Sequence, residues 1–350
     1  MDSGKLIWWA SENLRISFWR PLAELSQRLD YILWPDSPVM MHLHNLLLYG
    51  LMILLIGKLF LELDQNKQQA GLATLLFAGN MLHVFAVAWL ASRNQMLCGV
   101  LMALTLLCFH RWRQGASALY GLGAFVSLSL GLLSAEAAVQ TMGYLLAYAL
   151  FLDNNRPWLD RAKALIPFVV LILVWKVTHG HLGYGSFGSP GYVDPSSNAS
   201  RFAGLLILRL PVLMAAQWLG ISSMMFEQLD QVTQYAYAGG AITLLFGLAY
   251  VIYRLGGFQT ALGRFYAMGS IVSLIPACAG YTFDRLTVNS DIGASGMLAM
   301  LAMLVWHQRA TLKGGSLPIV KWAAYIVSFI HLLAFPVGKI ASSIMMKPLT

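Results

Sequence analysis

Charged residues are scarce in this chain. Asp, Glu, Lys and Arg make up 11% of its 350 residues, whereas hydrophobic residues make up 58%. An ordinary soluble domain carries about 25% charged residues. A soluble chain with so few charges would expose large apolar patches and aggregate, but apolar side chains that face lipid need no polar cover. The composition therefore excludes an ordinary soluble protein and favours an integral membrane protein.

Other signals are also missing. Cys98, Cys108 and Cys278 all lie within apolar runs, and no CxxC or Cys/His spacing typical of a metal site is present. The N-terminus has no apolar segment like that of a signal peptide. The net charge is +8, but the Lys and Arg residues stand singly or in small groups between apolar runs. We therefore expect no metal, no cofactor and no nucleic-acid partner, and the lipid bilayer is the expected surrounding.

What the chain does have is apolar runs of roughly 15–25 residues, each long enough to cross a bilayer as a helix. They predict an all-α, polytopic transmembrane bundle of about ten spans. The run from Leu119 to Leu152 would be about 51 Å long as one helix, well over the core thickness of about 30 Å, so we expect it to reverse near Glu136. The expected spans lie near residues 45–63, 70–86, 94–109, 118–133, 137–152, 163–178, 236–253, 265–281, 292–306 and 318–336.

Basic residues in every second connection predict the orientation, because short cytoplasmic loops are rich in Lys and Arg. Residues 1–43 are then expected on the outer side of the membrane, as are Arg93, Arg285 and the Gly-rich segment from His179 to Arg201. The connections placed in the cytoplasm contain Lys58 and Lys67, Arg111 and Arg113, Arg156, Arg161 and Lys163, Arg254 and Arg264, and Arg309, Lys313 and Lys321.

The chain is predicted to form one integral-membrane domain over residues 1–350. Residues 1–43 form an outer loop with an amphipathic, interfacial helix in Pro21–Trp34, and residues 44–178 form the core spans. Residues 179–235 form a second outer loop, and residues 236–350 hold the last spans.

Phe202–Ile221 is apolar enough to cross the membrane, yet the spans on both sides already agree in orientation without it. Arg209 and Pro211 are also awkward at the centre of a membrane helix. We interpret this segment as a re-entrant or interfacial helix on the outer side. The alternative is an ordinary span.

Ionisable residues near a bilayer are costly and raise a functional hypothesis. On the predicted outer side, Glu136 either caps the next helix or lines a cavity, where it would pair with an Arg or a substrate group. Arg93 either anchors a helix end or holds a phosphate. The remaining candidates are Arg20, His42, His44, His83 and the loop from His179 to Asp194.

Three sequence blocks, in this order, resemble a known superfamily. They are FWRPLAELSQRLDYILWPDSPVMMHLHNLLLYG from Phe18, LLFAGNMLHVFAVAWLASRNQML around His83 and Arg93, and LLSAEAAV around Glu136. They are similar to segments of the GT-C superfamily of membrane glycosyltransferases, which includes protein O-mannosyltransferase-like and TPR-containing mannosyltransferase-like proteins. The resemblance covers about residues 15–152.

The resemblance implies transfer of a sugar from a polyprenyl-phosphate donor to an acceptor on the outer, periplasmic face of a bacterial inner membrane. It implies that Arg20, His83 and Arg93 bind the donor phosphate and that Glu136 is the candidate catalytic residue. His42, Asn45 and Asn94 match supporting positions.

The chain departs from the family pattern at several points. Family members have a further span before the RPL block, followed by an acidic residue taken as the base, and neither is found here. The usual Pro before His83 is Leu82, and the usual Lys before Glu136 is Ala135. Under this resemblance we expect the chain to be either truncated or inactive as a transferase. The alternative function is a non-catalytic binder or transporter of lipid-linked sugars.

The predicted orientation can be tested with reporter tags fused after Arg93, Glu136, Lys67 and Arg113. A reporter that is active only outside the membrane is expected to be active at the first two positions and inactive at the last two. Reporter activity that places Arg93 and Glu136 on opposite sides would rule out a shared outer site.

Overall fold

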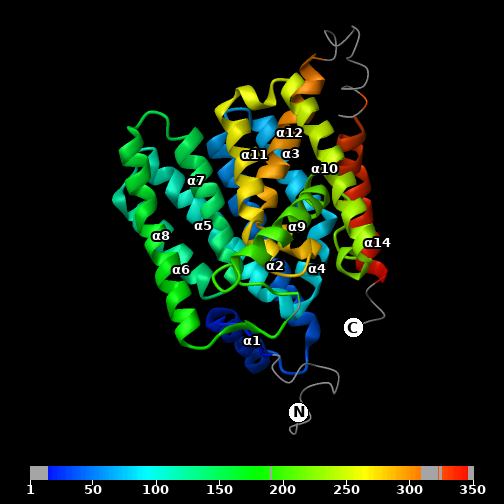
Figure 1. The fold of residues 1–350 in the computed structure, drawn as a ribbon. Coiled ribbons are helices and arrows are strands. Elements are labelled where there is room, and N and C mark those ends of the chain that lie inside the picture. Colours follow the sequence, from blue (N-terminus) through cyan, green and yellow to red (C-terminus); the bar gives the residue numbers. More distant parts are fainter. Residues whose placement is uncertain (1–14, 190, 309–321, 323–324, 346–350) are drawn as a thin grey trace.

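The computed structural model describes residues 15–189, 191–308, 322 and 325–345, and it is an all-α protein (Figure 1). Within that part of the chain, β-structure is limited to β1 (Arg15–Ser17) and β2 (Gly185–Phe187), which pair antiparallel. This pairing ties the start of the described chain to the Gly-rich loop after residue 181. The all-α prediction is confirmed.

Most of the long helices could each cross a membrane. By length and composition, six helical segments of the described chain qualify, and a bent pair of helices would make a seventh. The chain is therefore a multi-pass membrane protein. The six segments are α2 (Pro38–Leu63), Leu90–Arg113 with α5 (Arg93–Arg113), α8 (Trp158–His181), α9 (Ala199–Leu219), α10 (Gln231–Arg254) and Ala261–Ala279 with α11 (Ala261–Leu274).

The predicted second span is the bent pair. It consists of α3 (Lys67–Gly79) and the segment Met81–Ala88, which ends in α4 (Val84–Ala88), and the two parts meet at 43°. Asn80 lies at the break, where its side chain accepts a hydrogen bond from the Leu82 N–H at 3.0 Å. Local side-chain bonding of this kind competes with the helical backbone pattern and favours a break.

The predicted reversal near Glu136 is also present. α6 (Ala118–Leu132) ends there, a 3-10 turn, η3 (Glu136–Gln140), follows, and α7 (Thr141–Phe151) leads away. α12 (Asp291–Gln308) matches the next-to-last expected span. The last expected span, 318–336, lies partly outside the described residues. Its described part belongs to an apolar helix over Tyr325–Gly338, which continues into α14 (Phe335–Met345).

Side-chain caps account for where several helices begin. The Asn66 side chain accepts hydrogen bonds from the backbone N–H groups at the start of α3, at 3.0 and 3.2 Å. Asp230 does the same for α10, at 3.1 and 3.2 Å, and Thr260 for α11, at 2.9 Å. The first N–H groups of a helix have no partner within it, so a polar residue at these positions stabilises the start of the helix.

α1 (Pro21–Leu33) is the amphipathic helix predicted for Pro21–Trp34. It lies across one end of the bundle, below α2 and α4 in Figure 1. Its Leu22 N–H donates to the Leu133 carbonyl at 3.1 Å. Leu25 and Ile32 are 63% and 68% exposed. We refer to this end as the outer end, because the predicted topology places residues 1–43 outside.

Segments on both sides of α9 are hydrogen-bonded to the chain between α11 and α12. The Val193 N–H, just before α9, donates to Ala279 at 2.8 Å, and the Ser223 N–H, just after it, donates to Asp284 at 2.7 Å. In its middle, Arg209 donates to the Cys278 carbonyl at 3.1 Å. All three partners lie between α11 and α12, so α9 packs against that part of the chain.

α7 and α11 pack backbone to backbone at Gly143. A Cβ atom added there would lie 2.5 Å from the Ser273 nitrogen and 2.9 Å from its Cα, which leaves no room for a side chain. By contrast, nothing lies within 4 Å of the equivalent position at Gly50, in α2. Small residues at helix contacts are typical of membrane bundles, because they let the backbones approach.

This contact makes a testable prediction. Gly143→Ala should force α7 and α11 apart and destabilise the protein by about 1–3 kcal/mol, the usual cost of overpacking. The measurement is thermal unfolding in detergent, with Gly50→Ala as the control that keeps its stability. Equal stability of both variants would contradict the close contact.

Candidate functional site

Arg20 and Glu136 form an ion pair at the outer end. Arg20 Nε and Nη2 lie 2.8 and 2.7 Å from Glu136 Oε2, and the two side chains are 28% and 27% exposed. Arg20 precedes α1, and Glu136 opens η3, so the pair joins segments that are 116 residues apart. The Arg20 guanidinium also lies over the Phe18 ring, 4.0 Å from its centroid. These two residues, both predicted as site residues, are therefore brought together.

Two further ionisable residues lie within electrostatic range of this pair. His179, at the end of α8, interacts electrostatically with Glu136 and Arg20, and Arg285 interacts electrostatically with Arg20. Glu136 Oε1, His179 Nε2 and Arg285 Nε are each buried and have no hydrogen-bond partner among the described residues. Buried polar atoms of native proteins are nearly always bonded, so unpaired atoms from three segments around one ion pair are typical of a site that binds a polar group.

Arg285 lies in the connection between α11 and α12, where aromatic rings hold it. Its guanidinium lies 4.8 Å from the Trp89 ring centroid and 5.1 Å from that of Phe283, and Nη1 donates to Ser92 at 3.3 Å. Burial lowers the pKa of Arg285, and the nearby Arg20 lowers it further. Arg is effectively always protonated in proteins, so this side chain adds a positive charge.

The loop between α8 and α9 covers the same end. Asp194 pairs with Lys176 of α8 and accepts a hydrogen bond from the Ser196 N–H at 2.9 Å. Burial raises the pKa of Asp194, but the hydrogen bonds from Lys176 and Ser196 outweigh it, so that the pKa lies below its usual value. Tyr184 stacks on Trp19 with ring centroids 6.3 Å apart. The loop is thus held beside Arg20.

Arg93 belongs to a second cluster, buried beneath α1. Its side chain is 1% exposed and pairs with Asp30, while Nε donates to Asn45 at 2.9 Å and Nη2 to the Met41 carbonyl at 2.8 Å. His44 Nδ1 lies 2.7 Å from Asp30. Since nearly all its donors are occupied, Arg93 joins α1, α2 and α5. A phosphate could reach it only by displacing a protein ligand.

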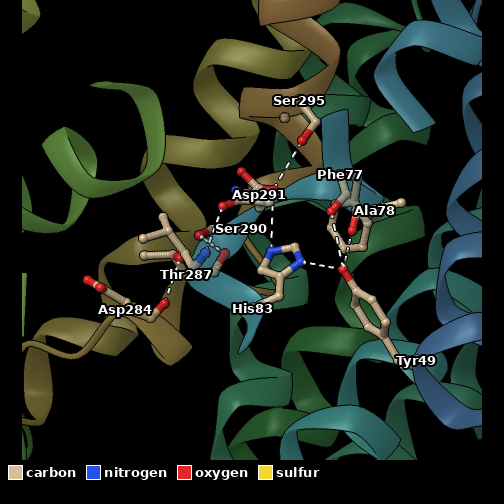
Figure 2. A network of polar contacts seen from close by, with 12 residues as sticks. Tyr49, Phe77, Ala78, His83, Asp284, Thr287, Ser290, Asp291 and Ser295 are labelled. Carbon is tan, nitrogen blue, oxygen red and sulfur yellow. Dashed lines mark hydrogen bonds and ion pairs between the residues drawn. The ribbon is translucent and has the colours of Figure 1, made fainter. Parts of the chain in front are cut away.

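His83 belongs to a third cluster, inside the bundle (Figure 2). Its Nε2 lies 3.4 Å from Asp291 Oδ2, and its Nδ1 lies 3.0 Å from the Tyr49 hydroxyl. Asp291 also accepts hydrogen bonds from Asn80 at 2.9 Å and Ser295 at 3.1 Å. Both His83 and Asp291 are at most 1% exposed. This network connects α2, the break after α3 and the start of α12.

The predicted site residues thus fall into three clusters. Arg20 and Asp30 stand at opposite ends of α1, ten residues or about 15 Å apart. Arg93 and Asn45 lie with Asp30, and Glu136 lies with Arg20. His42 is half-buried and Asn94 is buried, and their side chains make no hydrogen bond with any of the described residues.

Two acidic residues in these clusters were not among the predicted site residues. Asp30 pairs with Arg93 across 63 positions, and Asp291 lies beside His83 across 208 positions. A physical rule could have indicated them, because a buried Arg or His in a membrane bundle needs an acidic partner. The residue type could be anticipated, but the choice of partner depends on helix packing.

Comparison of the chain with protein-family models, with curated proteins and with solved structures finds no match. Among the described residues, no group of three or more His, Cys, Asp or Glu side chains could hold a metal ion.

The Arg93–Asp30 pair makes a quantitative prediction. Arg93→Met leaves the Asp30 carboxylate buried without its cation and should destabilise the protein by about 3–5 kcal/mol. The double variant Asp30→Asn, Arg93→Met removes both charges and should recover part of that loss. Thermal unfolding in detergent measures both effects. The Asp30→Asn single variant completes the comparison. A loss of stability in the double variant equal to or greater than the summed losses of the two single variants would contradict the pairing.

Proposed function

We propose that the protein is a GT-C-like glycosyltransferase that moves a sugar from a polyprenyl-phosphate donor to an acceptor at the outer face of the membrane. The observation that carries this proposal is the partly exposed Arg20–Glu136 pair, with the unpaired polar atoms of His179 and Arg285 beside it. Cations and a carboxylate at one membrane surface are the groups that this reaction needs.

Each group has a defined role in the proposed reaction. The Arg20 guanidinium binds two oxygens of the donor phosphate, a geometry that suits its planar fork of donors, and Arg285 adds positive charge. Glu136, released from Arg20, accepts the proton of the acceptor hydroxyl. The acceptor oxygen then bonds to the anomeric carbon, and the bond from that carbon to the phosphate oxygen breaks, leaving the electron pair on the phosphate.

Arg93 and His83 support this site at a distance in the proposal. The Arg93 side chain is held by Asp30 and Asn45, and His83 lies between Tyr49 and Asp291. A direct role in binding the phosphate, as the family resemblance implies, requires these protein contacts to open. In the contacts as they stand, Arg93 positions α1, and α1 follows directly after Arg20.

The proposed setting is a bacterial inner membrane crossed by ten spans, with the Arg20–Glu136 pair at the periplasmic face. The spans would be α2, the bent α3–α4 segment, α5, α6, η3 with α7, α8, α10, α11, α12 and the helix over 325–345. α9 would lie in or near the outer interface, which is supported by the attachment of both its flanks to the connection between α11 and α12.

A second candidate function is a non-catalytic binder or transporter of lipid-linked sugars. It is favoured by one observation: Arg20 neutralises Glu136, so the carboxylate is not free to act as a base until something separates the pair. Under this alternative the same cations bind the phosphate, but no bond is broken.

The test is transfer of labelled sugar from a polyprenyl-phosphate donor by the purified full chain in liposomes. Arg20→Ala and Glu136→Gln should each lower the rate about 100-fold or more, the usual effect of removing a charge-stabilising group or a general base. Arg28→Ala and Glu24→Gln change exposed residues of the same charge on α1 and serve as matched controls.

The outcomes separate the two functions. Loss of transfer in the site variants alone supports the transferase. Donor binding that depends on Arg20, without transfer by the unaltered protein, supports the binder. Equal transfer by the site and control variants would exclude the Arg20–Glu136 pair as the active site.

A further inference from the structure

A pocket of about 330 Å³ lies between α1 and α2, away from the Arg20–Glu136 pair. Its volume falls within the range of about 300–1,000 Å³ that is usual for small-molecule sites. Apart from two polar residues, its wall consists of apolar side chains. The lining residues are Leu29, Asp30, Leu33, Trp34, Met40, Leu43, His44 and Leu47.

The position of the pocket points to lipid as its environment. α2 is a candidate membrane span, and α1 lies across the outer end of the bundle, so the pocket lies where the two meet. Leu33, Leu43 and Leu47, in its wall, are 53%, 43% and 65% exposed. Large apolar side chains around a concave surface at this depth favour contact with hydrocarbon over contact with water.

The charges at the floor of the pocket disfavour an anionic occupant. The Asp30 carboxylate is already paired with Arg93 and lies 2.7 Å from His44 Nδ1. The lining residues include no Lys or Arg. A phosphate inside the pocket would therefore find no free cation and would lie beside a carboxylate, which is unfavourable in a medium of low dielectric constant.

We propose that this pocket binds an acyl chain of a bilayer phospholipid. In a phospholipid the glycerol backbone separates the chain from the phosphate, so the chain can enter while the charged group stays at the membrane surface. A polyprenyl phosphate carries its phosphate directly on the end of the chain, so entry of that end would bring the phosphate next to Asp30. The phosphate of the donor proposed above is thus not expected in this pocket.

A bound acyl chain also has a structural consequence. It covers the partly exposed His44 side of the Asp30–Arg93–His44 cluster and keeps water away from it. Ion pairs are stronger where water is excluded, so the chain strengthens the contacts that hold α1 on the bundle. The lipid would act as a structural ligand of α1, independent of sugar transfer.

The experiment uses the full chain in nanodiscs with a phosphatidylglycerol that carries a photoreactive diazirine in one acyl chain. Cross-linked peptides are identified by mass spectrometry, and labelling of α1 and α2 at Leu29–Leu47 is expected. Leu47→Trp fills the pocket and should lower this labelling about tenfold, which corresponds to about 1.4 kcal/mol of binding. Leu54→Trp, at a 71% exposed position two turns further along α2, should leave it unchanged.

A parallel sample contains a polyprenyl phosphate with a diazirine in the chain. Preferential labelling of the pocket by the phospholipid supports the proposal, and preferential labelling by the polyprenyl probe overturns it. Equal phospholipid labelling of the Leu47→Trp and Leu54→Trp variants also overturns it, provided that both elute as monodisperse proteins. None of these results bears on whether Arg20 and Glu136 carry out transfer.

Discussion

The buried ion pair between Arg93 and Asp30 is the contact on which the arrangement of the outer end depends. A charge that enters a bilayer-spanning bundle needs an opposite charge and a full set of hydrogen bonds, or it costs several kcal/mol. Arg93 meets this requirement with Asp30, Asn45 and the Met41 carbonyl. Because Asp30 lies on α1 and Arg93 opens α5, the requirement fixes a surface helix to the bundle.

The position of α1 in turn determines the Arg20–Glu136 pair and the pocket between α1 and α2. Arg20 immediately precedes α1, and its ion pair with Glu136 joins the start of this helix to η3. At the other end of α1, Asp30 and its leucine neighbours form one wall of the pocket against α2. One helix therefore supports a polar site near its first residue and an apolar pocket near its last, and the length of the helix keeps them about 15 Å apart.

The same rule of paired charges operates deeper in the bundle. Asp291 is at the first position of α12, where a carboxylate is favoured by the partial positive charge of the helix start. Its Oδ2 also accepts hydrogen bonds from Asn80, at the break of the bent segment. Figure 2 shows the hydrogen bond that it accepts from Ser295. The break after α3 thus places the polar side chains of Asn80 and His83 beside Asp291 in the core.

The sequence alone determined the class of the protein, most helix positions and the existence of α1, because these depend on apolar runs, their spacing and the residues that start helices. The reversal before Glu136 followed from length alone, since the apolar run exceeded the thickness of a bilayer. Which charges pair was decided only by the tertiary structure. Arg93 and Asp30, or His83 and Asp291, are far apart in sequence, and no local pattern specifies which helices pack together. A charged residue in the sequence of a membrane bundle indicates that a partner of opposite charge is needed, but which residue is that partner depends on how the helices pack.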